Sequence, residues 1–305
     1  MPRENEKNLY KLIKFLFFEE RGSWPEWVEN KATPSFSNKK NEVVITFLNH
    51  ATYLAEVEGK RLLFDPIFSD NAGPNSYFGV KRIRPPAVPM SELPTINYIF
   101  ISHNHYDHLD LPSLKFISNR DKPLIFVPLG DKEWLEDEGI SNIIELDWWQ
   151  KYKINKCFTV NFVPAQHSSS RTPFDLDISL WGGYVVESPA TTLFHAGDTG
   201  YAGHFKEIGN RFNIDIAMLP IGDYQPKWFL EYVHMDPKQA LMAHIDLNSK
   251  QSFAMHSETF PLSTLGYNEA EKEFNAAYKA QKFSYPFEIL EVGESVSYEV
   301  SSSCE

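Results

Sequence analysis

The sequence predicts an α/β (α+β) fold in which short strands and helices alternate along the chain. Two observations carry this prediction: β-rich runs recur from residue 42 onward, and stretches with helical periodicity or helix-capping residues separate them. Of the 305 residues, 42% are hydrophobic and 14% are aromatic, which suffices for a large buried core. No internal repeat or clear break divides the pattern, so we separate only residues 1–41, an N-terminal helix with a linker, from the body formed by residues 42–305.

The first predicted element is a helix within residues 9–18. Its apolar face consists of Leu12, Ile13, Leu16 and Phe17. Lys11 and Lys14 lie beside this face. The stretch is too short to span a bilayer, and it lacks the small-residue cleavage site of a signal peptide. The helix therefore either packs on the body or lies in a membrane interface, and the polar residues 29–41 after it are expected to form a linker.

The body is expected to alternate strands with helices. The predicted strands are 43–48, 53–57, 61–64, 97–101, 124–127, 159–163, 184–187, 191–194, 214–219 and 252–255. The predicted helices are 131–138, one that opens at Asp236 with Pro237 in its first turn, and 268–279. Residues 69–94 are rich in Pro, Gly and Asn, which predicts a long surface loop.

Charge and cysteine content exclude several classes of protein. Lys and Arg number 29 and Asp and Glu number 41, so the formal charge is −12, and a broad basic face for nucleic acid is not expected. Cys157 and Cys304 are too few for a disulfide framework or a four-cysteine zinc site, and nothing in the sequence demands an oxidising compartment. We expect a cytoplasmic protein that meets the inner face of a membrane at its periphery; a homodimer is left open.

The strongest chemical signal follows directly after the strand at 97–101. Three imidazoles and two carboxylates fall within eight residues, at His103, His105, Asp107, His108 and Asp110. Imidazole and carboxylate are the ligands of Zn, Fe and Mn. On an extended segment His103 and His105 point the same way, whereas Asp107 and His108 leave at another angle and can serve a second ion.

Three further candidate ligands each follow a predicted strand: His167, Asp198 and His256. Each would be unremarkable alone, and their recurrence at strand ends is what makes them candidates. Asp65 also ends a strand and is expected to accept a hydrogen bond behind the ligands, a role that is equally open to His50. His204 and His244 are expected to be structural, whereas His234 either orients a ligand or packs.

These motifs resemble the metallo-β-lactamase superfamily and, within it, the N-acyl-phosphatidylethanolamine-hydrolysing phospholipase D family. The resemblance extends over about residues 43–298 and is judged from motifs in family order. The motifs are Phe64-Asp65-Pro66-Ile67-Phe68-Ser69, residues 102–110, Val127-Pro128-Leu129-Gly130, Glu145-Leu146-Asp147-Trp148-Trp149, residues 196–201, Pro220-Ile221-Gly222 and His234-Met235-Asp236-Pro237.

The resemblance implies a fold, a cofactor and a reaction. The fold would be a four-layer αβ/βα sandwich of two mixed sheets, with residues 42–305 as the catalytic domain. Two zinc ions, or Fe or Mn instead, would be bound, and a phospholipid would be hydrolysed to phosphatidic acid and N-acylethanolamine. One ion would be held by His103, His105 and His167, the other by Asp107, His108 and His256, and Asp198 would bridge them.

Departures from the family pattern leave the substrate open. The family has a Lys shortly after the position of His167, where this chain has Arg171, so Arg171 is expected to neutralise phosphate. Tyr106 or a water molecule would protonate the leaving group. His195 stands where the family has an aromatic residue. A lactonase or a phosphodiesterase acting on a soluble molecule is the alternative, and a metal-stabilised structural module is the non-enzyme alternative.

A diacyl phospholipid substrate requires contact with a membrane surface. The expected contact regions are the N-terminal helix and the loop at 69–94. The aromatic and basic residues of this loop are Tyr77, Phe78, Lys81, Arg82 and Arg84.

Overall fold

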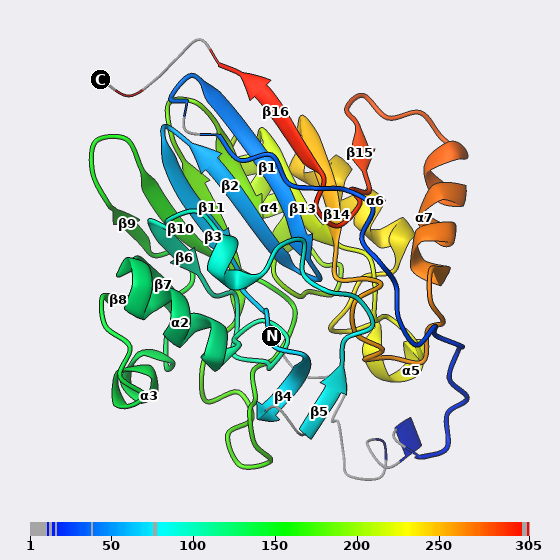
Figure 1. Cartoon of the computed structure of the whole chain (residues 1–305). Coiled ribbons are helices and arrows are strands. Elements are labelled where there is room, and N and C mark those ends of the chain that lie inside the picture. Colours follow the sequence, from blue (N-terminus) through cyan, green and yellow to red (C-terminus); the bar gives the residue numbers. More distant parts are fainter. Residues whose placement is uncertain are drawn as a thin grey trace.

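Two seven-stranded β-sheets form the centre of the computed structural model (Figure 1). The structure describes residues 11, 14, 15, 17–37, 39–75, 78–300 and 304. The first sheet has the order β16 (Ser295–Glu299), β1 (Glu42–Asn49), β2 (Thr52–Val57), β3 (Lys60–Phe64), β6 (Tyr98–Phe100), β7 (Leu124–Pro128) and β8 (Ile143–Leu146). Its strands β3, β6, β7 and β8 are parallel and the others antiparallel, so the sheet is mixed.

The second sheet is also mixed. Its order is β15 (Phe287–Glu288), β14 (Gln251–Met255), β13 (Ile216–Pro220), β12 (Thr192–His195), β11 (Gly182–Glu187), β10 (Thr159–Pro164) and β9 (Lys151–Lys153). Strands β12 to β15 are parallel, which places the carboxyl ends of β12, β13 and β14 at one edge of the sheet. Candidate ligands follow two of these strands, Asp198 after β12 and His256 after β14.

Helices cover the outer faces of the two sheets. They are α2 (Leu111–Asp121), α3 (Lys132–Asp137), α4 (His204–Arg211), α5 (Lys227–Leu230), α6 (Pro237–Leu247) and α7 (Glu269–Lys279), with a 3₁₀ turn, η1, at Met90–Glu92. One buried cluster packs Leu114 and Ile117 of α2 on the first sheet, and a larger one joins both sheets to α4, α6 and α7. This arrangement confirms the four-layer αβ/βα sandwich that the resemblance implied.

The segment at 69–94 is more ordered than the predicted surface loop. It contains a two-stranded hairpin, β4 (Asn71–Asn75) and β5 (Phe78–Lys81), and two buried arginines. Arg82 is 2% exposed and donates to the carbonyls of Ser69 and Ile67 at 2.8 and 3.1 Å. Arg84 is 7% exposed and lies 3.7 Å from the carboxylate of Glu258. The expectation that both arginines contact lipid head groups is therefore wrong, because both guanidinium groups are used inside the protein.

The N-terminal segment packs against the body. Phe15 stacks on Phe229 at 4.9 Å between ring centroids, whereas Phe17 is 75% exposed. The other apolar residues of the predicted face, Leu12, Ile13 and Leu16, lie outside the described residues, as does Tyr77. Beyond the helix, Gly22 donates its N–H to the carbonyl of Thr264 and Val28 donates to that of Ile83, so residues 22–28, which precede the expected linker at 29–41, form a strap on the body.

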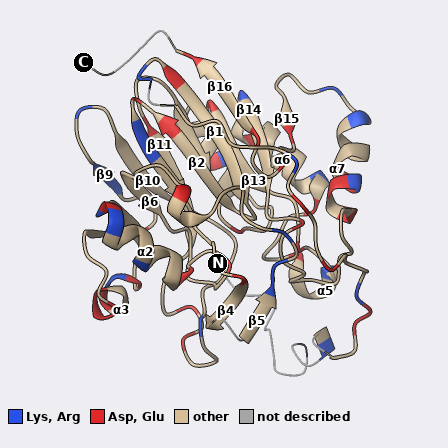
Figure 2. Cartoon of the chain, in the orientation of Figure 1, with Lys and Arg blue, Asp and Glu red and all other residues tan. Residues whose placement is uncertain are grey.

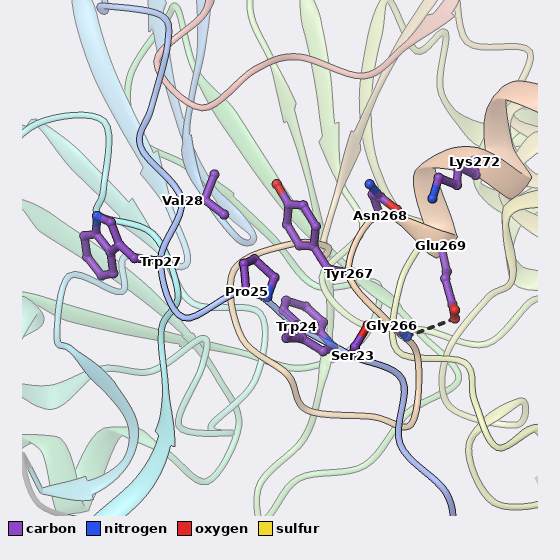
Figure 3. A pocket seen from close by; sticks show the side chains of 10 residues that line it. All are labelled: Ser23, Trp24, Pro25, Trp27, Val28, Gly266, Tyr267, Asn268, Glu269 and Lys272. Carbon is purple, nitrogen blue, oxygen red and sulfur yellow. Dashed lines mark hydrogen bonds between the residues drawn. The ribbon is translucent and has the colours of Figure 1, made fainter.

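This strap closes one side of a cavity of about 610 Å³ (Figure 3). Trp24 meets Tyr267 edge to face at 5.7 Å and donates its indole N–H to the carbonyl of Leu265 at 2.7 Å. The opposite wall is the start of α7, where the carboxylate of Glu269 accepts the N–H of Gly266 at 2.9 Å. None of the candidate metal ligands lines this cavity.

Cys157 and Cys304 are joined by a disulfide. Cys157 lies between β9 and β10 of the second sheet, and Cys304 follows β16 of the first, so the bond connects the two sheets. The cysteine count did not predict this pair. Across the described part of the chain, no helix combines the length and apolar character needed to cross a membrane.

Candidate metal centre

The candidate ligands lie on loops that follow strands of both sheets. Residues 102–110 follow β6, His167 follows β10, Asp198 follows β12 and His256 follows β14. The structure brings all seven predicted ligands into four overlapping groups of side chains whose ligand atoms lie within 4.8 Å of one another.

The first group contains three imidazoles. Nε2 of His103 lies 2.9 Å from Nδ1 of His105, which lies 3.1 Å from Nε2 of His167. These are the three residues that the resemblance assigned to one ion. His103 and His167 are buried and His105 is half-buried, so the group opens toward solvent on the side of His105.

The second group is fully buried and has one member more than expected. Oδ2 of Asp107 lies 3.4 Å from Nε2 of His108 and 3.3 Å from Nε2 of His256. The additional member is His50, whose Nε2 lies 3.0 Å from the same carboxylate oxygen. His50 thus lies among the candidate ligands rather than only behind them.

Asp198 connects the two groups. Its Oδ2 lies 3.0 Å from Nε2 of His256 and 3.2 Å from Nε2 of His108 in the second group. The same oxygen lies 3.7 Å from Nε2 of His167 and 3.9 Å from Nε2 of His103 in the first. One carboxylate thus faces both groups, as a bridging ligand would.

The side chains fit divalent metal ions. Two ligand atoms bound to one zinc ion in tetrahedral geometry lie roughly 3.4 Å apart, close to the separations around Asp198. Three of the imidazoles also have an acceptor at the other nitrogen: Nδ1 of His108 faces Asp65 at 2.8 Å, Nδ1 of His167 faces the carbonyl of Val233 at 2.9 Å, and Nδ1 of His256 faces Asp223 at 3.2 Å. An acceptor on Nδ1 favours the tautomer with a bare Nε2 lone pair turned inward.

Two buried polar atoms without hydrogen-bond partners among the described residues also indicate a cation site. Nε2 of His108 and Oδ1 of Asp198 have no hydrogen-bond partner within the described part of the chain. Leaving buried polar atoms unsatisfied is costly, and a bound cation would satisfy both.

The electrostatics of the centre favour cations. Burial opposes ionisation of Asp198, but the neighbouring His108 and His256 hold the pKa of Asp198 well below its ordinary value, and His108 does the same for Asp107. Burial and the nearby His256 lower the pKa of His50 to about 4, so this imidazole is neutral at physiological pH. Although burial opposes this, the carboxylates in turn raise the pKa of His108 and His256 well above its ordinary value, so each of these imidazoles has to lose a proton when a metal binds. The carboxylates and His50 are already in the form that binds metal.

Asp65 and Ser102 hold the first ligand loop on the sheet. The carboxylate of Asp65 accepts from the backbone N–H and the hydroxyl of Ser102 at 2.7 and 2.6 Å, and it also contacts His108. Asp65 thus accepts hydrogen bonds behind the ligand loop. Asp65, His50 and His256 have left-handed φ values of 41°, 45° and 60°, conformations that cost free energy and recur at functional sites.

A second support braces the same loop from the other side. The side chain of Asn104, between two ligands, donates to the buried carboxylate of Asp131 at 3.1 Å. Nη1 of Arg171 donates to the carbonyls of Asn104 and Leu109 at 2.8 and 2.9 Å. The hydroxyl of Tyr106 donates to the carbonyl of Arg171 at 2.8 Å. Arg171 and Tyr106 thus brace the ligand loop, and their expected roles toward phosphate and leaving group stay predictions.

Sequence reasoning missed Asp223 and undervalued His234. Asp223 follows β13 and faces His256, and Nδ1 of His234 lies 3.8 Å from Oδ2 of Asp198. The chain passes close to His256 just before Asp223, because a Cβ on Gly222 would lie 2.0 Å from the carbonyl oxygen of His256, a contact that only the structure reveals. His195 stacks on Phe64 at 5.0 Å, as an aromatic residue at this position would.

Comparison with known proteins shows the family. A family profile described as a β-lactamase superfamily domain matches residues 60–257, more than half of the chain. The chain belongs to this superfamily. Among solved structures, this chain resembles an isothiocyanate hydrolase from Delia radicum gut bacteria, with a TM-score of 0.66 and 20% sequence identity. The match covers 84% of this chain and 100% of that chain. This chain also resembles Igni18, a metallo hydrolase from Ignicoccus hospitalis, with a TM-score of 0.63, 23% identity and coverage of 85% and 100%. At these identities the likeness shows the fold.

Several other known proteins are more similar in sequence. N-acyl-phosphatidylethanolamine-hydrolyzing phospholipase D 1 of Caenorhabditis elegans is 36% identical over 233 residues, which cover 73% of this chain and 65% of that protein. The mitochondrial enzyme of that name from Saccharomyces cerevisiae is 36% identical over 231 residues, 73% of this chain and 49% of that protein. A UPF0173 metal-dependent hydrolase of Methylacidiphilum infernorum is 32% identical over 259 residues, 83% of this chain and 98% of that protein.

The chain thus spans slightly less than two thirds of the worm relative and about half of the yeast one. Together, the profile, the relatives and the His/Asp groups show a metal-dependent hydrolase of the metallo-β-lactamase superfamily.

Proposed function

We propose that the protein is a two-metal phosphodiester hydrolase that acts as a phospholipase D, releasing N-acylethanolamine and phosphatidic acid from N-acyl-phosphatidylethanolamine. The observation that carries the two-metal part is the position of Asp198 Oδ2, within 3.9 Å of imidazole nitrogens from both ligand groups. The similarity to two phospholipases of this specificity supports the lipid substrate.

Seven residues would hold the two zinc ions. One ion would be held by His103, His105 and His167, and the other by the buried residues Asp107, His108 and His256. Asp198 would hold both ions. When bound, two such ions activate water and stabilise charge on the phosphoryl oxygens. Asp65 and Asp223 keep His108 and His256 in the tautomer that presents Nε2 to the centre.

Proton delivery to the leaving alkoxide falls to Tyr106 or to water. The Tyr106 hydroxyl donates to the carbonyl of Arg171, so it must release that bond before it can protonate a substrate oxygen. Tyr106→Phe distinguishes the two sources. Loss of turnover with an unchanged metal content assigns the proton to Tyr106, whereas retained turnover assigns it to water.

The test is a substrate comparison. Metal-replete protein is incubated with N-acyl-phosphatidylethanolamine in detergent, with a lactone and with a simple soluble phosphodiester, in water enriched in ¹⁸O. We expect phosphatidic acid that carries ¹⁸O in its phosphate, because water attacks phosphorus. Asp198→Asn should abolish this product, whereas Asp137→Asn, a change of an exposed carboxylate, should not. Turnover of the lactone alone, or release of fatty acid from the phospholipid, would overturn the proposal.

A further inference from the structure

The loop between β10 and β11 has an inverted exposure pattern. Its apolar side chains Phe174, Leu176 and Ile178 are 91%, 52% and 69% exposed. The two acidic residues that alternate with them, Asp175 and Asp177, are half-buried. Soluble proteins normally turn carboxylates outward and apolar side chains inward, so this arrangement needs an explanation.

The inversion is built by hydrogen bonds. The carboxylate of Asp175 accepts the backbone N–H groups of Arg171 and Thr172 at 3.0 and 2.7 Å and the hydroxyl of Ser170 at 3.1 Å. Oδ1 of Asp177 accepts a hydrogen bond from the backbone N–H of Ser169 at 3.2 Å, and the backbone N–H of Asp177 donates to the carbonyl of Ser169 at 2.8 Å. The carboxylates thus tie the loop to itself, and the alternation leaves the apolar side chains outside.

The same loop is attached to the metal centre. It contains the candidate ligand His167, and three residues before Phe174 the guanidinium of Arg171 donates to the carbonyls of Asn104 and Leu109 in the ligand loop. Tyr106, next to the half-buried His105, donates its hydroxyl to the Arg171 carbonyl. The exposed residues Phe174, Leu176 and Ile178 therefore lie near His105, where the first ligand group opens to solvent.

A second apolar projection lies at the same edge. Phe78, the first residue of β5, is 68% exposed. In Figure 1 the β4–β5 hairpin and the loop after β10 both extend from the lower edge of the molecule. Figure 2 shows Lys and Arg interspersed with Asp and Glu in this view, without a broad basic face.

We propose that Phe174, Leu176 and Ile178 form an anchor that inserts into the interface of a phospholipid bilayer and holds the metal centre at the membrane surface. This inference rests on the proposed lipid substrate. Single side chains that project from a loop suit the acyl–head-group boundary better than the hollowed or flat surface of a protein partner.

The charges select the kind of bilayer. The chain carries −12, and Arg82 and Arg84, which the sequence offered as lipid contacts, are buried. Electrostatic attraction to anionic lipid therefore contributes little, and apolar insertion has to provide the affinity. The partner is thus a bilayer of zwitterionic phosphatidylcholine, and binding should change little with salt.

Two measurements test the anchor. In the first, Phe174→Cys is labelled with an environment-sensitive fluorophore, which is feasible because both native cysteines are bonded to each other. Phosphatidylcholine vesicles should shift its emission to the blue, whereas Ile245→Cys on α6, where Ile245 is 56% exposed, should stay unshifted. A shift that instead grows with protein concentration, without vesicles, would show a second copy at the tip and overturn the inference.

The second measurement is vesicle co-sedimentation. Changing Phe174, Leu176 and Ile178 to Ser should weaken binding by about tenfold or more, because three projecting apolar groups are lost. The matched control changes Met242 and Ile245, exposed residues of α6, to Ser and should bind like the unmodified protein. Equal binding by the anchor variant and the control would overturn the inference, as would binding that disappears at high salt.

Failure of the anchor and failure of the proposed function give different results. Turnover of a soluble phosphodiester should be the same for the anchor variant and the unmodified protein, because the changed residues lie outside the metal centre. If the protein binds vesicles but hydrolyses no lipid, the anchor stands and the proposed function fails. If it hydrolyses N-acyl-phosphatidylethanolamine in detergent but does not bind vesicles, the function stands and the anchor fails.

Discussion

Asp131→Asn should change how the stability of the protein depends on pH. Asp131 is completely buried, and its Oδ1 accepts from the side chains of Asn104, Ser179 and Trp134 at 3.1, 2.8 and 3.1 Å. Burial raises the pKa of Asp131 from 3.8 to about 6, although these donors and the nearby Arg171 act in the opposite direction. The folded protein therefore retains a proton on Asp131 at pH values where the unfolded chain has lost it.

The sign and size of the effect follow from this pKa. Between pH 3.8 and about 6 the native state binds more protons than the unfolded state, so the contribution of Asp131 to stability falls as the pH rises. The difference of about two pKa units corresponds to about 3 kcal/mol. Asn cannot ionise, so the variant escapes this loss. Its free energy of unfolding relative to the unmodified protein should rise by about 3 kcal/mol from acid to neutral pH, or roughly 5 °C in Tm for a chain of this length.

Urea unfolding at a series of pH values measures this difference. Asp137→Asn, which changes an exposed carboxylate of α3, is the matched control and should track the unmodified protein throughout. If Asp131→Asn and Asp137→Asn gave parallel curves against pH, the reasoning that burial dominates at Asp131 would be refuted.

Three further predictions concern ligands, packing and the disulfide. Asp107→Asn should lose chiefly one of two bound ions, because an amide is a poorer ligand than a carboxylate; elemental analysis would show equal ion counts in variant and parent if this is wrong. Gly222→Ala should displace His256, because the carbonyl oxygen of His256 would lie 2.0 Å from the new Cβ. Metal binding should weaken by about 10- to 100-fold in a competition titration with a chelator, and an unchanged affinity would contradict this. Cys304→Ser should lower the free energy of unfolding by about 3–5 kcal/mol, because the disulfide closes a loop of 147 residues. Urea unfolding measures this loss, and reduction of the disulfide in the unmodified protein should reproduce it.

The sequence was informative wherever the chemistry is local. The spacing of residues 103–108 after a strand identified most of the ligand set, and Asp236 with Pro237 identified the start of α6, where Asp236 and Gln239 form a reciprocal cap at 2.9 and 3.0 Å. The ends of β10, β12 and β14 supplied the other three ligands, because strand ends in one sheet meet at a common edge. Such patterns depend on residues close in sequence.

The sequence was uninformative where the partner is remote. Nothing near Arg84 indicates that its guanidinium meets Tyr267 and Glu258, so an exposed basic residue was predicted. Cys157 and Cys304 are 147 residues apart, and their pairing depends on the packing of the two sheets. Asp223 carries no motif of its own, and only the packing of β13 beside β14 places it on His256.

The most direct test of the account is the number of metal ions that the protein binds. The two groups of ligand atoms share Asp198, so a metal-replete sample should contain two transition-metal ions per chain by elemental analysis, and Asp198→Asn should reduce the binding of both. One ion per chain or none in the unmodified protein would contradict the two-metal centre from which the proposed function is argued.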